Sequence, residues 1–167
     1  MKKAIAYNEL AGRGLEVLSK GALLTSQHNG KTNTMTIGWG SFGFAWKRPL
    51  FMAMVRTSRF SHELIEGSGE FTVSIPFSNI QQQLGICGSR SGRDIDKISV
   101  AGLSVLPGEK TAVPVINTPG LHYECKVVCK QQMTAATTDE PVKTEWYADN
   151  DYHTLYFGEI VASYVIE

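Results

Sequence analysis

The sequence lacks the features of a membrane-inserted or secreted protein. No apolar run reaches the length of a transmembrane helix, and the first residues carry two lysines without the apolar core of a secretory signal. The three cysteines, Cys87, Cys125 and Cys129, are too few and odd in number for a disulfide framework. We therefore expect a cytoplasmic protein with structural cysteines and no membrane contact.

Motifs of several enzyme classes are also missing. The chain contains no HExxH, no GxSxG and no pair of CxxC motifs, which leaves metalloprotease, serine hydrolase and zinc-ribbon functions without support. Gly12-Arg13-Gly14 lacks the third glycine and the strand–turn–helix context of a dinucleotide-binding fingerprint. The four histidines, His28, His62, His122 and His153, are scattered along the chain, and we expect no metal site.

The chain has no excess of charge of one sign. Sixteen basic residues balance sixteen acidic ones, so no long-range field favours nucleic acid or an anionic membrane surface. An anionic ligand therefore has to be held by a local cluster of donors. The 167 residues, 43% hydrophobic and 19% charged, are enough for one core, and we expect a single domain over residues 1–167.

The hydrophobic pattern predicts a mainly β protein with short peripheral helices. Strands are expected at residues 21–27, 32–39, 50–55, 71–75, 121–133, 144–148 and 153–166. Asn29-Gly30 predicts a tight hairpin between the first two strands. Short helices are expected at 61–67, from Ser78 or Asn79 to Cys87, and at 96–101. Because strands and helices do not alternate regularly, an antiparallel barrel is favoured over a doubly wound sheet.

Two polar segments contain the chemistry of an anion site. Arg56-Thr57-Ser58-Arg59-Phe60-Ser61-His62 places two guanidinium groups and three hydroxyls between a buried strand and a helix start, an arrangement that suits a phosphate. A hydrophilic turn whose serine caps the helix is the alternative. The second segment, Cys87 to Lys97, is rich in glycine and donors and could close over a ligand, or form a solvated loop with a helix cap at Asp94 or Asp96. It lacks the GKS/T ending of a nucleotide P-loop.

Taken in order, several segments resemble the flavin reductase-like family that includes flavoredoxins. The matching segments are Asn33 to Trp39, Pro49 with the apolar strand after it, Arg56 to Ile65, Gly69 to Pro76, Cys87-Gly88, Ser91 to Lys97, Glu124-Cys125, and His153 followed by Gly158-Glu159-Ile160. Together they cover most of the chain from Ala22 onward. The resemblance implies an FMN-binding split β-barrel, usually a homodimer with each flavin near the subunit interface.

The resemblance also implies which residues would contact FMN. Four residues would line the isoalloxazine ring: Thr36, Ile37, Gly38 and Trp39. Four would take the phosphate: Arg56, Thr57, Ser58 and Ser61. Lys97 would approach the ring from the second polar segment. The remaining candidates for cofactor binding are Asn33, His62 and Ser91, and His122 and His153 are looser ones.

These expectations lead to an FMN-dependent oxidoreductase that passes electrons from NAD(P)H or a redox protein through bound FMN. The flavin would carry the redox chemistry. Lys97 near the pyrimidine edge would stabilise the negative charge that develops there on reduction. Two alternatives stay open: a flavoredoxin-like electron carrier without its own NAD(P)H turnover, and a non-catalytic flavin-binding module.

Overall fold

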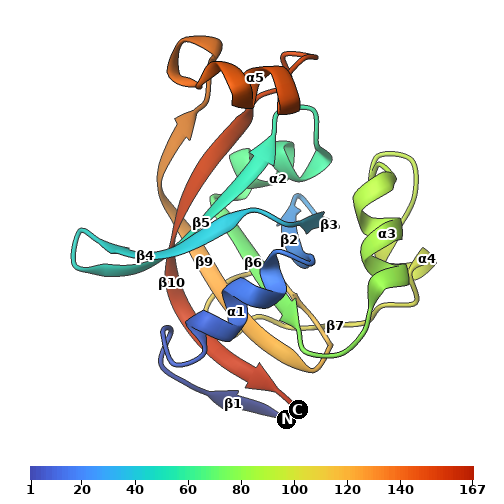
Figure 1. Cartoon of the computed structure of the whole chain (residues 1–167). Coiled ribbons are helices and arrows are strands. Elements are labelled where there is room, and N and C mark those ends of the chain that lie inside the picture. The colour runs from blue at the N-terminus through green and yellow to red at the C-terminus, as the bar shows by residue number, and fades with distance from the viewer.

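A computed structural model describes all residues of the chain and shows a mainly β protein with short helices, as the sequence predicts (Figure 1). The strands are β1 (Lys2–Ala4), β2 (Ala22–His28), β3 (Lys31–Ile37), β4 (Gly40–Ala45), β5 (Arg48–Arg56), β6 (Glu70–Pro76), β7 (Val105–Leu106), β8 (Val115–Ile116), β9 (Gly120–Gln132) and β10 (His153–Ile166). The helices are α1 (Ala11–Leu18), α2 (Phe60–Ser68), α3 (Gln81–Ser89), α4 (Lys97–Val100) and α5 (Glu140–Trp146), with a 3₁₀ turn at Ala135–Thr137. None of the five helices has the length and apolar character needed to cross a bilayer.

Eight strands form one antiparallel sheet in the order β3-β2-β6-β9-β10-β5-β4, with β1 added to β10. The two long strands, β9 and β10, lie side by side in the middle of the sheet. Their pairing shifts register between Phe157 and Gly158 and again between Ile160 and Ala162, and such irregularities bend a sheet. The sheet therefore curves around its own inner face (Figure 1).

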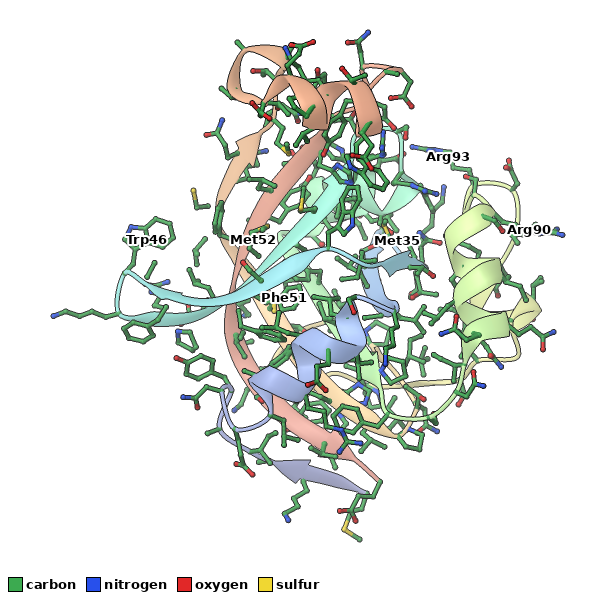
Figure 2. The ribbon with its side chains drawn as sticks, viewed as in Figure 1. Met35, Trp46, Phe51, Met52, Arg90 and Arg93 are labelled. Atoms are coloured by element: carbon green, nitrogen blue, oxygen red, sulfur yellow. The ribbon has the colours of Figure 1, made fainter.

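The β4–β5 hairpin projects from the sheet with Trp46 at its tip (Figure 2). Trp46 and Lys47 both have positive φ angles, 52° and 57°, which the two central residues of a tight type I′ turn require. Phe44 and Trp46 are 64% and 62% exposed. The hairpin thus presents aromatic side chains to solvent.

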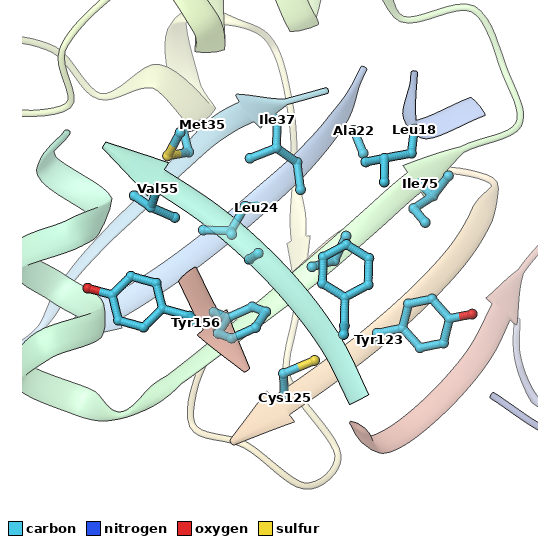
Figure 3. Close-up of a cluster of buried hydrophobic side chains, with 14 of the residues drawn as sticks. Leu18, Ala22, Leu24, Met35, Ile37, Val55, Ile75, Tyr123, Cys125 and Tyr156 are labelled. Atoms are coloured by element: carbon cyan, nitrogen blue, oxygen red, sulfur yellow. The ribbon is translucent and has the colours of Figure 1, made fainter. Parts of the chain in front are cut away.

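The concave face of the sheet holds the main core (Figure 3). Alternate residues of β6 point into it, and Phe71, Val73 and Ile75 are fully buried. On the other face of β6, Thr72 donates to the Pro114 carbonyl at 2.7 Å. The segment that contains β7 and β8 therefore covers the outer face of β6.

Glu124 fixes part of this covering segment. Its carboxylate, fully buried on β9, accepts hydrogen bonds from the backbone N–H groups of Glu109 and Lys110, both at 2.7 Å, and of Thr111 at 3.0 Å. The Tyr164 hydroxyl also donates to it at 2.8 Å. Burial raises the pKa of Glu124, but these hydrogen bonds to the charged form outweigh burial and leave the pKa below its usual value.

Most of the expected elements are present, and their local signals explain them. Asn29 and Gly30 have φ angles of 48° and 74° and close the β2–β3 hairpin. Asp96 caps α4 by accepting from the N–H groups of Ile98 and Ser99, each at 3.1 Å. The predicted helices at 61–67 and up to Cys87 correspond to α2 and α3.

Three details of the prediction are wrong. Residues 144–148 are not a strand: α5 extends through Trp146, because Pro141 in the first turn fixes a helical φ angle and Glu140 complements the helix dipole. Ser61 does not cap α2, since Arg59 stands at that position and Ser61 lies inside the first turn. The cap position of α3 is Ile80, not Ser78 or Asn79. The elements α1, β1, β4, β7 and β8 were not predicted.

Candidate functional site

Two adjoining pockets form one groove between β3, the start of α2, the α3–α4 segment and the loop before β10. The pockets have volumes of about 470 Å³ and about 90 Å³ and share Met35, Arg56 and Arg59. The larger pocket, here called the polar end, is lined by Asn33, Met35, Arg56, Ser58, Arg59, Phe60, Ser61, Ser89, Arg90, Ser91, Gly92, Lys97, Asp149 and Asp151. The smaller pocket, here called the aromatic end, is lined by Met35, Thr36, Ile37, Gly38, Trp39, Met54, Arg56, Arg59 and His153.

The groove unites the segments that the sequence singled out. The polar end contains six of the expected residues: Asn33, Arg56, Ser58, Ser61, Ser91 and Lys97. The aromatic end contains the four residues expected to line a flavin ring, Thr36, Ile37, Gly38 and Trp39, together with His153. Residues far apart in the chain thus meet with polar donors at one end and aromatic side chains at the other.

The start of α2 forms part of the polar end. The chain is extended at Arg59 and turns helical at Phe60, and no group in the protein accepts a hydrogen bond from the N–H of Phe60 or of Ser61. Such first-turn N–H groups, with the helix dipole behind them, attract anions. The buried Ser61 hydroxyl accepts from Asn33 Nδ2 at 2.9 Å.

Gly92 brings the α3–α4 segment close to this surface. A Cβ atom at position 92 would lie 2.0 Å from Asn33 Oδ1, so only glycine permits the observed approach. Ser89, Arg90 and Ser91 line the pocket from the same segment. Gly92 therefore determines how tightly this wall closes on Asn33.

Two buried or partly buried cations hold the end of α3 against the groove. Lys97 Nζ donates to the Cys87 carbonyl at 2.9 Å, and Arg59 Nη1 donates to the Gly88 carbonyl at 3.0 Å. Lys97 is only 4% exposed, and burial lowers its pKa to about 8. It lines the polar end and is absent from the aromatic end, where Trp39 and Gly38 lie.

A network around Arg56 and Asp151 connects the polar end to the loop before β10. Arg56 Nη1 donates to the Asp151 carbonyl at 2.8 Å, and Arg56 Nη2 donates to the Trp146 carbonyl at 2.7 Å. The Asp151 carboxylate accepts from Thr57 Oγ1 at 3.1 Å, from Ser58 N–H at 3.2 Å and from Ser58 Oγ at 2.5 Å. Burial raises the pKa of Asp151, but the hydrogen bonds from Ser58 and Thr57 outweigh it and lower the pKa below the usual range.

The aromatic end is built around Trp39 and His153. The Trp39 ring lies 4.9 Å from Trp146 in an edge-on arrangement and 5.4 Å from the His153 ring, measured between centroids. The Tyr147 hydroxyl is hydrogen-bonded to His153 Nδ1 at 2.7 Å. Burial lowers the pKa of His153 to about 4, with Arg56 as a smaller cause, so the imidazole is neutral at pH 7.

Three expected residues do not line the groove. His122 lies under the β7–β8 segment, where its two ring nitrogens meet Ser74 Oγ and the Thr118 carbonyl, both at 3.0 Å, because alternation along β9 directs it to the outer face. His62 is turned about 100° around α2 from Ser61 and contacts Thr154 Oγ1 at 3.1 Å. Thr57 contacts Asp151 instead of facing the pocket.

The groove also contains residues that the sequence did not assign to it. Arg59 and Arg90 stood in the two donor-rich segments, so their residue type was a signal for an anion site. Met35 lay within the matched segment but carried no polar group. Asp149 and Asp151 gave no signal, since they lie far along the chain from the arginine they contact. No group of three or more histidine, cysteine or acidic side chains gathers in a way that could hold a metal ion.

Comparison with protein families finds one matching model, described as a flavin reductase like domain, over residues 17–167. The uncharacterized protein YddH of Escherichia coli (strain K12) is 30% identical over 143 residues, which is 84% of this chain and 67% of YddH. An uncharacterized protein of Archaeoglobus fulgidus is 28% identical over 131 residues, which is 78% of this chain and 64% of the relative. The chain thus spans about two thirds of the length of these curated relatives.

Solved structures share the fold. Flavoredoxin from Methanosarcina acetivorans is 30% identical with a TM-score of 0.70, over 88% of this chain and 68% of that one. A split barrel domain from Shewanella frigidimarina is 21% identical with a TM-score of 0.70, over 95% of this chain and 75% of that one. The split-barrel fold expected from the sequence is confirmed.

We predict that the free energy of unfolding decreases as the pH falls from about 6.5 to about 4. His122 and His153 have pKa values lowered to about 4 in the folded protein by burial, so the unfolded chain binds more protons in this interval. Each histidine contributes a slope of at most about 1.4 kcal/mol per pH unit. Urea denaturation at a series of pH values measures the slope. His122→Gln removes one titrating group and should flatten the dependence of the unfolding free energy on pH. An unchanged slope would contradict the lowered pKa of His122.

Proposed function

The chain belongs to the flavin reductase-like domain family, and from this we propose that it is an oxidoreductase that binds FMN in the groove. It would pass electrons from NAD(P)H or from a redox protein through the flavin. The observation that carries the proposal is the groove itself, because one cleft combines free helix N–H groups and cations at one end with aromatic side chains at the other. This is the pattern of polarity along an FMN molecule.

The residues present fit FMN. The N–H groups of Phe60 and Ser61 and the cations Arg59, Arg90 and Lys97 would hold the phosphate at the polar end. Trp39, Gly38 and their neighbours on β3 would pack against the isoalloxazine at the aromatic end. Bound FMN would supply the redox chemistry, which no side chain of the groove supplies.

The chain's own residues would position the ligand and adjust its environment. Lys97 lies with Arg59 and Ser61 at the polar end, and this placement favours a contact with the phosphate over the contact with the pyrimidine edge that the resemblance implies. His153 engages Tyr147 through Nδ1, which leaves Nε2 free to exchange a hydrogen bond with a ligand beside Trp39. As a neutral imidazole it would do so without adding charge.

A flavoredoxin-like electron carrier is the second candidate, and the 30% identity to a flavoredoxin favours it. Either donor would have to meet the flavin at the open aromatic end, where Trp39 is 38% exposed.

The three cysteines are all free thiols, which supports the proposal of a cytoplasmic location.

We predict that the purified protein turns yellow with FMN and that Gly92→Ala weakens FMN binding by roughly tenfold or more. The added Cβ would collide with Asn33 Oδ1 and push the wall of the polar end outward. Quenching of flavin fluorescence measures the dissociation constant. Gly85→Ala is the matched control, because a Cβ there meets nothing within 4 Å. A wild-type protein that stays colourless with FMN would defeat the proposal.

The electron donor is tested by anaerobic mixing of the FMN-loaded protein with NADH or NADPH. We expect the flavin absorbance near the visible maximum to bleach within seconds if the protein is an NAD(P)H-dependent enzyme. Bleaching that requires a reduced redox protein would instead identify an electron carrier. If the flavin keeps its colour both with NAD(P)H and with a reduced redox protein, the enzyme and the electron carrier are both contradicted. A flavin-binding module without electron transfer would then remain.

We also propose a homodimer, which the exposed aromatic hairpin supports. Phe44 and Trp46 project from the sheet, and Trp46 lies 6.5 Å from the Phe157 ring. Light scattering during gel filtration should give the mass of two chains. The double substitution Phe44→Ser with Trp46→Ser should shift the mass toward one chain, because burying two aromatic side chains contributes several kcal/mol at about 25 cal/mol per Å². Val100→Ser, an exposed apolar residue on α4, should not.

A further inference from the structure

An internal carboxylate contacts the donors that the sequence motif offers to a phosphate. Asp151 accepts hydrogen bonds from Thr57 Oγ1, Ser58 N–H and Ser58 Oγ at 3.1, 3.2 and 2.5 Å, and its Oδ2 lies 3.9 Å from Arg56 Nη1. Both Ser58 and Asp151 line the polar end. The carboxylate therefore uses the two Ser58 donors, N–H and Oγ, that a phosphate oxygen at the polar end would otherwise accept from.

The turn before β10 places the Asp151 carboxylate beside Ser58. Asn150 has a φ angle of 59°, and the Asp151 N–H donates to Asp149 Oδ1 at 3.1 Å. Arg56 donates to two backbone carbonyls of the same region and lies 3.4 Å from Asp149 Oδ1. Two carboxylates therefore face one guanidinium, so Arg56 holds the turn and contributes little net positive charge to the polar end.

We propose that Asp151 competes with the ligand's phosphate for the Ser58 donors, and so sets how strongly the groove discriminates a flavin with a phosphate from one without. A phosphate near these donors has to share them with a carboxylate or displace it, and two anions a few ångströms apart repel. The ring contacts at the aromatic end do not involve Asp151. The inference rests on the proposed function.

The remaining phosphate contacts lie away from Asp151's donors. Arg59, Arg90, Lys97 and the N–H groups of Phe60 and Ser61 have no contact with its carboxylate. They would hold the phosphate in the wild-type protein, with the carboxylate opposing them. Removing the negative charge of Asp151 should lower the dissociation constant of FMN. The dissociation constant of riboflavin, which has no phosphate, should not change.

The test compares FMN with riboflavin in the full-length protein. Asp151→Asn keeps the shape and one acceptor oxygen but removes the charge, and fluorescence quenching gives the dissociation constants of both flavins. The ratio of riboflavin to FMN dissociation constants should rise by roughly tenfold over the wild type, with the riboflavin constant within about twofold. Asp139→Asn is the matched control, since Asp139 is exposed beside α5 and lines no part of the groove.

Asp151→Ser provides a second uncharged variant, and thermal unfolding checks that each variant is folded. The same rise in the ratio for both uncharged variants, and none for Asp139→Asn, supports the inference. An unchanged ratio, or weaker FMN binding in the folded variants, would show that Asp151 supports the site and would overturn it. If the wild-type protein binds neither flavin, the proposed function fails as well, whereas an unchanged ratio with normal riboflavin binding overturns only the competition.

Discussion

The antiparallel pairing of β10 with β5 is the interaction on which the rest of the structure depends. β10 pairs with β9 on one side and with β5 on the other, so it joins the β3-β2-β6-β9 half of the sheet to the β5-β4 hairpin. The register of this pairing sets His153 opposite Arg56. Because His153 belongs to the aromatic end and Arg56 to both ends, this pairing brings the start of β10 to the groove.

Much of the fold could be predicted because its signals are local. Asn29-Gly30 specified a hairpin, and the apolar content of β6 and β10 specified buried strands without reference to their partners. The error at residues 144–148 has a local cause too, since Thr144, Trp146 and Tyr147 are residue types common in strands. Pro141 and Glu140 at the helix start favour a helix over these residues instead. α1 was missed because it carries two glycines, of which Gly14 packs against Phe42 and Leu121.

The segments that line the candidate site could be predicted from the sequence, but the acidic residues that neutralise its cations could not. The residue types of segments 33–39 and 56–61 indicated a binding site in each segment, and the resemblance indicated that the two segments belong to one site. Which way a side chain faces depends on tertiary packing, so His62 and His122 were assigned to a groove that they do not line. The acidic turn that meets Arg56 was not predictable, since no local pattern connects Asp149 and Asp151 to an arginine on a strand far earlier in the chain. A donor-rich motif shows that hydrogen-bond donors are present. It does not show whether another side chain of the protein already accepts their hydrogen bonds.

The central place of β10 also affects how the chain is assembled during synthesis. The β4–β5 hairpin leaves the ribosome well before residues 153–166, and until then β5 has no partner on its second side. During that interval the unpaired edge of β5 and the aromatic rings of Phe44 and Trp46 are exposed together. An unpaired strand edge and exposed apolar surface make a partly folded chain prone to aggregate. The aromatic end of the groove is complete only once β10 has paired with β5, because that pairing sets His153 opposite Arg56.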